Sequence, residues 1–554
     1  MRGRGGWVGV LRTVAGGEER AGSFRNWRCL VAAGLLVATA ARLAADPPAP
    51  PPAEADRLLQ RCPIGEVRTD MAGPGFRENV RAPRKEAWER AQGGKARLAE
   101  ALRRRLAGWP ERRPEEIRLP AEAREFAWTL ARDTWRGLLA LRDREHALPI
   151  DHVRWFGPLF ATEGAKIGDY ASSTNMGLFL ASVVAAHDLG LASRDEAIGL
   201  VRAVLDTVAR LEKHRGFLFN YYDTTSLERT SNLLSFVDLS WWAAGLIVVR
   251  NALPELRGRV SRLLESEDYG FFYDRSRRQM RHGYFVHTRS FSPFHYGMLF
   301  TEARLGSFLA IGKGDVPREH WYGMVRAYPP GCTWQRQRPW QPQVLHRNGV
   351  AVYSGYYQWQ GVFYVPSWGG SMFEALMPLL FLDEVTLAPQ GLGGNARAHV
   401  RVQQRYVQEV LGHTVWGQSP ALDPNSEAYR EAGIPALGAR GYEPGPVTPH
   451  AAALALLVDP AAALGNLQEL ARRYPVYADF GFFDAVDPRS GRVATGYLIL
   501  DQAMTFLALA NFLGHHSVQR WFAADPIVQA ALPLLREEVW FEAGRPLDAG
   551  MAAQ

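Results

Sequence analysis

Apolar residues recur at helical spacing along most of the chain from about residue 121. In the segment 122–145, Phe126, Leu130, Trp135 and Leu138 fall close to the helical period, which places them near one face of a helix. Comparable patterns follow, usually without a strand between them. The predicted helices cover 122–145, 174–189, 195–213, 238–252, 300–312, 371–382, 397–411, 449–458, 460–473 and 500–513.

Strand patterns are confined to two aromatic connections. Segments 270–291 and 350–368 read as β-hairpins. The sequence shows no fixed-period repeat, which argues against a solenoid of identical units. Many paired helices of similar length with rich loops therefore predict an all-α toroid of inner and outer helices, with β-hairpin insertions in its loops and a pocket at one end of the inner ring.

The N-terminal region has the layout of a secretory signal peptide or an N-terminal anchor. Arg25 and Arg28 precede an apolar run over 29–41, which contains the small residues of 38–40 and is too short to span a membrane comfortably. We therefore predict export from a bacterial cell to the periplasm or medium, with residues 1–45 as the signal or anchor and a mature chain that begins after Ala40 or a few residues later.

The rest of the chain divides by composition. Residues 46–120 combine a Pro-rich linker with an extension rich in Arg, Glu and Ala, whose part from 83 to 118 reads as exposed helix. Residues 121–540 are predicted to form the main domain, and 541–554 a flexible tail.

Charge and cysteine content narrow the function classes. Of the 64 Lys and Arg residues, 23 lie in residues 1–120, so the body of the chain is near neutral. No basic stripe interleaves with aromatic residues, so nucleic acid is not a predicted partner. The three cysteines form no metal-type pair, and Cys62 and Cys332 are either bridged or free.

A carboxylate in an apolar helix is the strongest candidate for chemistry. Glu374 stands among Met372, Phe373 and Leu376, where burial is costly unless the carboxyl group is paired or protonated. Glu302 occupies a similar early position in another apolar helix. Two such carboxyl groups flanking one bond are what glycoside hydrolysis needs, and apolar burial suits Glu374 as the general acid with Glu302 as the base. The alternative is a buried structural ion pair.

Polar and aromatic residues near the predicted helix starts are candidates for binding a sugar. Four of them, Asp169, Asn175, Asp223 and Asp238, also have a structural interpretation as turn or cap residues. The candidate substrate-binding residues are Asp169, Asn175, Asp223, Asp238, Arg289, His295, Tyr296, Trp368 and His450.

Other catalytic schemes lack their motifs. The sequence has no nucleophile elbow, no P-loop and no H-E-x-x-H, and its 14 histidines are scattered without metal-ligand spacing. We therefore predict neither a metal nor a cofactor.

Several segments together resemble one known family. They are "SSTNMGLFLASVVAAHDLG", "NYYDTTSL", "FVDLSWW", "TEARLGSFLAIGKGDVPREHW", "SWGGSMFEALMPLLF", "ALGARGYEPGPVTPHAAALALL" and "FGFFDAVDP", in that order between about 150 and 535. This set is similar to the glycoamylase-like (glucoamylase-like) domain, which occurs in endo-β-1,2-glucanases of glycoside hydrolase family 144 and within cyclic β-1,2-glucan synthases. The resemblance implies an (α/α)6 toroid, action on β-linked glucan, and Glu374 and Glu302 as the leading functional acids.

The sequence therefore predicts an exported glycoside hydrolase that acts on an oligo- or polysaccharide, with β-1,2-glucan as the leading substrate. We expect a monomer that contacts no membrane beyond an N-terminal anchor. Two alternatives stay open: a transglycosylase on the same fold, favoured by a carboxyl separation nearer 5 Å than roughly 6.5–9.5 Å, and a non-catalytic glycan-binding protein.

Overall fold

The computed structural model describes Cys62 and residues 80–426 and 428–541. The chain divides into two units, Met1–Ala45 and Asp46–Gln554, and every described residue belongs to the second unit. The predicted signal or anchor, its cleavage site and the predicted tail lie outside the described residues, so these stay predictions.

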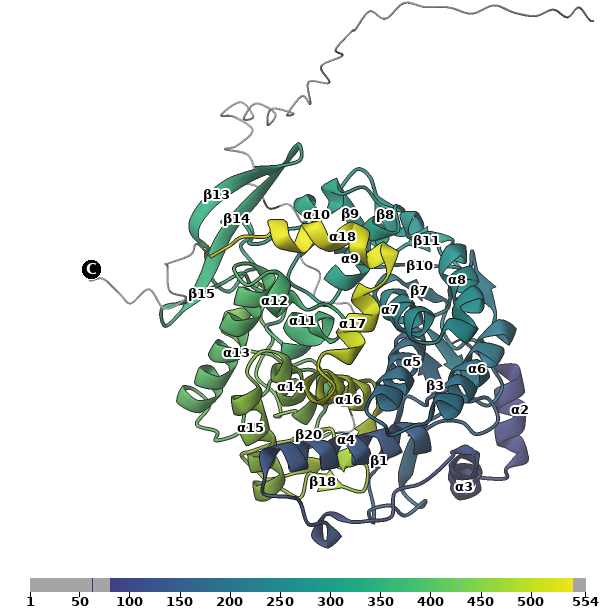
Figure 1. Cartoon of the computed structure of the whole chain (residues 1–554). Helices are drawn as coiled ribbons and strands as arrows, with labels where there is room; N and C mark the ends of the chain where they lie inside the picture. The colour runs from purple at the N-terminus through teal and green to yellow at the C-terminus, as the bar shows by residue number, and fades with distance from the viewer. Residues whose placement is uncertain (1–61, 63–79, 427, 542–554) are drawn as a thin grey trace, which may run out of the picture. The chain divides into compact units, whose positions relative to one another are not determined.

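Four helices pack together to form much of the core. Three of them, α5 (Ser173–Asp188), α7 (Phe236–Ala252) and α16 (Ile499–Leu513), are buried along nearly their whole length, and α5 packs against both α7 and α16. The fourth, α4 (Ala123–Ala140), packs on α16 with one face and lies at the edge of the molecule (Figure 1). Glycine allows the closest of these crossings, because a Cβ atom on Gly245 would lie 2.0 Å from the Gly177 carbonyl oxygen. Nearly all of α5 and α7 is buried, so these two helices carry little amphipathic signal.

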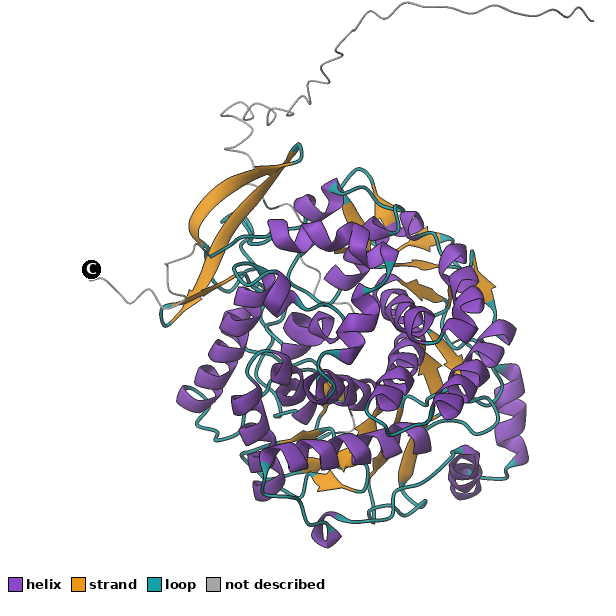
Figure 2. Cartoon of the chain, viewed as in Figure 1, coloured by secondary structure: helices purple, strands orange, loops and turns teal. Residues whose placement is uncertain are grey.

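Further helices complete a helix-rich fold (Figure 2). They are α2 (Pro83–Ala91), α3 (Lys95–Arg105), α6 (Arg194–Arg210), α8 (Arg257–Ser266), α9 (Arg304–Gly312), α10 (Glu319–Gly323), α11 (Met372–Leu376), α12 (Glu384–Leu387), α13 (Leu392–Glu409), α14 (Pro449–Leu454), α15 (Pro460–Arg473), α17 (Ser517–Ala523) and α18 (Pro526–Glu537). Short 3-10 turns, η1 to η6, cover Pro114–Glu116, Pro254–Leu256, Tyr269–Phe272, Met377–Leu380, Pro435–Leu437 and Ala455–Leu457. Each predicted helix has a counterpart, although those predicted over 371–382 and 449–458 each end in a 3-10 turn.

Small antiparallel sheets lie in the connections between the helices. Their strands are β1 (His152–Trp155), β2 (Ala165–Gly168), β3 (Tyr170–Ser172), β4 (Lys213–His214), β5 (Phe217–Leu218), β6 (Tyr221–Asp223), β7 (Leu233–Ser235), β8 (Tyr273–Asp274), β9 (Gln279–Arg281), β10 (Gly283–Phe285), β11 (Ser290–Phe291), β12 (His295–Tyr296), β13 (Trp340–Arg347), β14 (Val350–Trp359), β15 (Val362–Tyr364), β16 (Ala421–Leu422), β17 (Tyr429–Arg430), β18 (Tyr477–Ala478), β19 (Gly481–Phe482), β20 (Ala485–Val486), β21 (Val493–Ala494) and β22 (Gly496–Leu498). The largest have three strands, in the orders β2-β1-β22, β11-β10-β7, β12-β9-β8 and β13-β14-β15.

Both predicted hairpins contain paired strands. Within 270–291, β8 pairs with β9 and β10 pairs with β11, while within 350–368 β14 pairs with β15. The prediction over 350–368 missed β13, which pairs with β14 and forms with it the long hairpin that projects from the helices (Figure 2). Most of β13 is exposed or half-buried, so it carries no apolar alternation.

The N-terminal extension is attached to the core rather than free. The ammonium group of Lys85 on α2 is buried and forms ion pairs with Asp169 and Asp223. A disulfide joins Cys62 to Cys332 across a sequence separation of 270, which answers whether these cysteines pair.

Among the described residues, no single helix is long and apolar enough to cross a membrane. One pair of segments bent by 117°, Phe236–Ala252 with Pro254–Phe272, reaches the required length and composition together.

Candidate active site

A capping box explains why Glu374 is buried in an apolar helix. Ser371 is the N-cap of α11 and Glu374 is its third residue, the S-x-x-E arrangement in which each side chain bonds to the other residue's backbone N–H. The Ser371 hydroxyl accepts from the Glu374 N–H at 3.2 Å, and the Ser371 N–H donates to Oε2 of Glu374 at 3.0 Å. The glutamate is therefore required by the helix start itself.

Further donors converge on the same carboxylate. The Gly369 N–H lies 2.9 Å from Oε1, and the hydroxyl groups of Ser371 and Ser367 lie 2.8 Å and 3.3 Å from Oε2. Gly370, with a φ of +80°, makes the turn that directs these groups inward. Burial raises the pKa of Glu374, and these hydrogen bonds oppose that rise because they stabilise the charged form.

Glu374 forms no ion pair among the described residues, so hydrogen bonds stand where the alternative interpretation expected a structural ion pair. The nearby guanidinium of Arg304 instead pairs with Glu384, at 2.8 Å for each of its two hydrogen bonds. Arg304 also donates to the carbonyl oxygens of Glu374 and Ala375. This buried arginine therefore fixes the start of α9 against α11.

Glu302 lies immediately before α9 and keeps part of its surface accessible. Burial raises its pKa to about 8, and the negative charge of Glu374 contributes to that rise. Glu302 is thus protonated at neutral pH, while Glu374 holds its charge with several donors. Of the two acids, Glu302 is the one that can give up a proton.

Half-buried acids and tyrosines surround this pair. We use the name acid–tyrosine cluster for eight residues: Asp151, Tyr170, Tyr221, Asp238, Tyr296, Glu302, Glu374 and Tyr442. Their mutual charge effects place them near one another: burial raises the pKa of Tyr296, and Glu302 and Asp238 add to that effect. The cluster offers a proton donor, carboxylates and phenol groups in a water-limited setting.

Three predicted binding residues, Asn175, Asp238 and Tyr296, lie beside this cluster or within it. Asp238 on α7 accepts a 2.6 Å hydrogen bond from Thr174, and burial raises its pKa. Asn175 donates to Asp151 at 3.5 Å from the first turn of α5. Asp238 and Asn175 each stand in the first turn of a buried helix, α7 or α5. The predicted helix starts were therefore enough to place both residues near the site.

The sequence interpretation missed Asp151, Tyr170, Tyr221 and Tyr442. Asp151 precedes β1 and contacts His152 at 2.8 Å, and its charge adds to the effect of burial in raising the pKa of Tyr170. Tyr442 packs so closely on Gly369 that a Cβ atom there would lie 2.1 Å from its ring. The aromatic loops "GDY" and "NYYD" held the only local signal for two of these residues.

Asp169 and Asp223 both contact the N-terminal extension, so their role in substrate binding stays a prediction. Both pair with Lys85, and Asp223 also accepts hydrogen bonds from the backbone N–H groups of Thr225 and Ser226 at 2.9 Å and 2.6 Å. The interpretation of Asp223 as a turn residue is correct. Sequence reasoning missed the lysine because it lies far away in the N-terminal extension.

His295 and Arg289 also lie away from the acid pair in their contacts. His295 pairs with Asp274 at 3.0 Å within the β12-β9-β8 sheet, and Asp274 pairs with Arg281. Arg289 is exposed in the turn between β10 and β11, with a φ of +53°. Neither contact involves a residue of the acid–tyrosine cluster.

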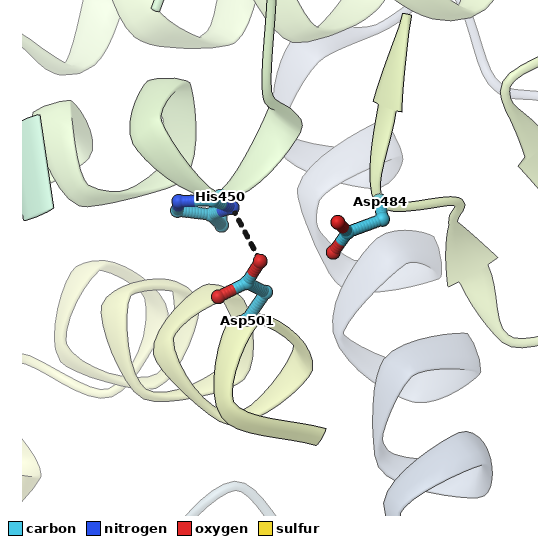
Figure 3. Close-up of side chains that lie close together, drawn as sticks. All are labelled: His450, Asp484 and Asp501. Carbon is cyan, nitrogen blue, oxygen red and sulfur yellow. Dashed lines mark ion pairs between the residues drawn. The ribbon is translucent and has the colours of Figure 1, made fainter. Parts of the chain in front are cut away.

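Trp368 and His450 are placed differently from each other. Trp368 is half-buried next to Gly369, and its ring lies 5.3 Å from the ring of Trp334. His450 is buried, and its ring lies beside Asp484 and Asp501 (Figure 3). Trp368 adjoins the loop that holds Glu374, whereas His450 belongs to a separate group of side chains.

A surface pocket of about 720 Å³ lies elsewhere on the protein. It is lined by residues of 114–126 and 468–477, and it contains none of the predicted site residues. Its lining offers no pair of carboxylates for hydrolysis, so the acid–tyrosine cluster is the better candidate for catalysis.

Comparisons with known proteins agree with this assignment of the fold. A family model described as "Putative glucoamylase" matches residues 336–526. The predicted resemblance to the glycoamylase-like family is confirmed. The matched segment includes Glu374, Tyr442 and the group of His450, Asp484 and Asp501.

One curated protein is similar over a longer stretch. The cyclic β-(1,2)-glucan synthase NdvB of Rhizobium meliloti is 32% identical over 305 residues, 52% of this chain. That alignment covers only 10% of the synthase, so this chain is similar to a small part of it.

Two solved structures share the fold. The β-1,2-glucanase from Parabacteroides distasonis has a TM-score of 0.58 at 16% identity, and the match covers 75% of this chain and 60% of that one. The endo-β-1,2-glucanase from Chitinophaga pinensis, solved with sophorotriose and glucose, has a TM-score of 0.57 at 13% identity and covers 75% and 98%. At these identities the likeness establishes the fold.

Proposed function

We propose that this protein is a glycoside hydrolase that acts on a β-linked glucan, with β-1,2-glucan as the leading substrate. The observation that carries the proposal is Glu302, a half-buried carboxyl group with a pKa of about 8 beside the charged Glu374. A protonated acid at neutral pH is what cleavage of a glycosidic bond requires. The β-1,2-glucanases that share the fold support the choice of linkage.

Glu302 is the proposed general acid. It protonates the leaving glycosidic oxygen, and the carboxylate that remains lies in a site with limited access to water. This reverses the roles expected from the sequence, because several donors around the Glu374 carboxylate favour its charged form.

Glu374 is proposed to act mainly through Glu302. Its fixed charge helps to keep the proton on Glu302 up to about pH 8, and its capping box holds the loop that carries Trp368 and Gly369. A carboxylate whose lone pairs are occupied by donors is a poor base. The activation of water therefore belongs to another carboxylate.

Asp151 and Asp238 are the proposed candidates for that base. Both are half-buried members of the acid–tyrosine cluster, and the charge of Asp238 adds to the raised pKa of Glu302. In an inverting hydrolase the two carboxyl groups stand about 6.5–9.5 Å apart to leave room for water. Single Asp→Asn substitutions at 151 and 238 distinguish the two, since only the base should show the larger loss of kcat.

The aromatic side chains are proposed to bind the sugar. Tyr296 and Tyr442 can donate hydrogen bonds to ring hydroxyl groups, and Trp368 offers a flat apolar face beside the acids. Asn175 supports the site indirectly, because its side chain donates a hydrogen bond to Asp151.

The finer fold assignment is also a proposal. We infer an (α/α)6 toroid whose inner helices include α5, α7 and α16, because these helices are buried on nearly all sides and pack against one another, with α5 between the other two. The acid–tyrosine cluster would then line one end of the inner ring.

Export is proposed on two grounds. The order of basic, apolar and small residues before residue 41 is that of a secretory signal. The disulfide between Cys62 and Cys332 adds support, because such bonds persist in oxidising compartments. N-terminal sequencing of the protein from its native host tests this, and an intact cytoplasmic chain starting at Met1 would contradict it.

A hydrolysis screen tests the proposed function. Purified protein is incubated with β-1,2-, β-1,3-, β-1,4- and β-1,6-glucans, and products are sized by chromatography. We expect release of short oligosaccharides from β-1,2-glucan, and loss of that release in Glu302→Gln. If no linkage is cleaved while a glycan still binds with micromolar affinity, the protein is a glycan-binding protein instead.

The similarity to part of a glucan synthase supports a second candidate, transglycosylation on the same site. The same digestion distinguishes it, because a transglycosylase produces chains longer than the starting oligosaccharide or cyclic products. A product mixture that only shortens with time supports hydrolysis.

A further inference from the structure

Three side chains of metal-ligand type meet in the core away from Glu302 and Glu374. His450 comes from α14, Asp501 from α16, and Asp484 from the link between β19 and β20 (Figure 3). One ligand atom from each residue lies within 4.8 Å of the other two. That span is comparable with about twice a metal–ligand distance of 2.0–2.4 Å.

Backbone pairing holds the three segments in place. Val447, just before α14, exchanges two hydrogen bonds with Val486, at 2.8 Å and 2.9 Å. The Asp484 N–H donates to the Gly496 carbonyl at 3.1 Å, and Gly496 begins β22, which leads directly into α16. The side chains therefore converge because a short ladder fixes the three backbones, without help from the side chains themselves.

The converging atoms lack hydrogen-bond partners. All three residues are only 2% exposed. Both ring nitrogens of His450 lack a hydrogen-bond partner within the described residues, although Nδ1 lies 3.1 Å from Oδ2 of Asp501. Oδ1 of Asp484 and Oδ2 of Asp501 have no donor either, unless a proton placed on one of the two acids joins them. Buried polar atoms in native proteins are nearly always partnered, so this group has an unfilled requirement.

Charge gives the same result. Neither Asp484 nor Asp501 pairs with a lysine or arginine in the described part of the chain. Two buried carboxylates without a counter-charge are costly, and the cost is removed either by a proton or by a cation. A proton shared between the two acids would leave both ring nitrogens of His450 without a hydrogen-bond partner.

We propose that His450, Asp484 and Asp501 bind one divalent transition-metal cation, such as zinc or manganese. One neutral imidazole nitrogen and two carboxylate oxygens are the mixed donor set that these ions accept. The imidazole disfavours calcium and magnesium, which prefer oxygen ligands. The ion satisfies the unpartnered atoms and balances the two negative charges.

The site has a supporting contact that orients one ligand. The Leu422 N–H donates to Oδ2 of Asp484 at 2.6 Å, which leaves Oδ1 free to face His450 and Asp501. Ligating carboxylates in metal sites are commonly held by such an outer hydrogen bond.

Metal content measures the proposal without reference to activity. The full chain, with any affinity tag removed, is dialysed against a chelator and then given zinc or manganese in slight excess, followed by gel filtration. We expect about one ion per chain by mass spectrometry of the metal, and a higher Tm in the loaded protein. Calcium serves as the ion that should not be retained.

Two ligand variants and one matched control complete the test. We expect His450→Ala and Asp484→Asn to retain about tenfold less metal at equal free concentration. His295→Ala is the control, because it also removes a histidine that contacts an aspartate and should bind as the original chain does. Circular dichroism checks that each variant is folded, and Asp501→Asn replaces any that is not.

Failure has a defined form. If the original chain retains neither zinc nor manganese and its Tm is unchanged, the cluster is a carboxyl pair that shares a proton, and the proposal is overturned. Equal loss of metal from the His295→Ala control also overturns it, because the ion then sits elsewhere. Neither result bears on the hydrolysis screen, so the two proposals fail separately.

Discussion

At the scale of single residues, the proton on Glu302 is the central feature. Its pKa of about 8 means that the folded protein holds a proton that the unfolded chain releases near pH 4.5. The active form should therefore persist from neutral pH up to about pH 8 and decline above it. We expect the alkaline limb of kcat/KM against pH to have its midpoint near 8, measured on the best substrate from the linkage screen.

The same proton affects stability, with a sign that can be checked. Because the folded pKa is raised, the folded state binds more protons than the unfolded state between about pH 4.5 and 8. Glu302 therefore lowers the free energy of unfolding as pH rises through that window. Glu302→Gln should flatten this dependence and reduce kcat by about 10²–10⁴-fold.

Glu267 provides a matched control for that variant. Burial raises its pKa to about 8 as well, but it accepts hydrogen bonds from Trp242 and Tyr269 and lies outside the acid–tyrosine cluster. Glu267→Gln should alter stability against pH in the same direction and leave the pH profile of kcat/KM unchanged. A shifted activity profile in this control would mean that the alkaline limb reports unfolding rather than catalysis.

Glu374 makes a different prediction, because its charge acts on a neighbour. Glu374→Gln removes the charge that helps to hold the proton on Glu302, so the alkaline limb of activity should move to lower pH. The amide also donates where the capping box needs an acceptor, so the Tm should fall.

Ser371→Ala separates these two effects. It removes the cap hydroxyl at a cost of about 1 kcal/mol but keeps the Glu374 charge, so the alkaline limb should stay in place while the Tm falls. If both variants shift the limb equally, the loop geometry and not the charge sets the pKa of Glu302.

At the scale of elements, α2 shows that a segment far away in the sequence can form ion pairs with residues that were predicted to be functional. Its Lys85 neutralises Asp169 and Asp223, which lie at the same end of the β3–β6 pair. Lys85→Ala leaves two largely buried carboxylates without a counter-charge and should cost about 3–5 kcal/mol of unfolding free energy. Chemical denaturation measures that loss.

Activity tells whether those aspartates also serve the site. We expect kcat/KM per folded molecule to be unchanged in Lys85→Ala, because Asp169 and Asp223 make their contacts with the extension. Lys95→Ala, an exposed position on α3, is the control for general effects of altering the extension. A large loss of activity in Lys85→Ala alone would return the two aspartates to the substrate site.

Which elements the sequence predicts depends on their burial pattern. Helices with one apolar face, such as α4 and α15, are evident from spacing alone. The exposed strand β13 carried no alternation, and α18 was overlooked because Pro533 interrupts its pattern. The position and cap of α11 follow from S-x-x-E, so the local role of Glu374 was within reach of the sequence.

At the scale of the whole molecule, the candidate site depends on contacts between distant segments. Glu302 and Asp238 were predicted because each stands near the start of a predicted helix, and Tyr296 because it shortly precedes the helix that carries Glu302. Which of two acids holds the proton was not predictable, since the answer comes from the number of donors around Glu374 and from the engagement of Arg304 by Glu384. The group around His450 was missed for the same reason, since its members come from three separate segments.

The disulfide joins two distant parts of this molecule, and it offers a prediction at the same scale. Cys62 and Cys332 are linked across 270 residues, so the bond restricts the unfolded chain over about half of its length. Removing such a bond costs about 2–4 kcal/mol, chiefly by freeing the unfolded state. We expect Cys62→Ser with Cys332→Ser to lower the Tm under oxidising conditions and to match the reduced original chain. Addition of a reductant should lower the Tm of the original chain and leave that of the double variant unchanged.

Activity at temperatures below both transitions should be equal in the two proteins, because neither cysteine contacts the acid–tyrosine cluster through a hydrogen bond or ion pair. A double variant as stable as the oxidised protein would show that the native contacts of the N-terminal segment, led by Lys85, already hold it in place without the covalent bond.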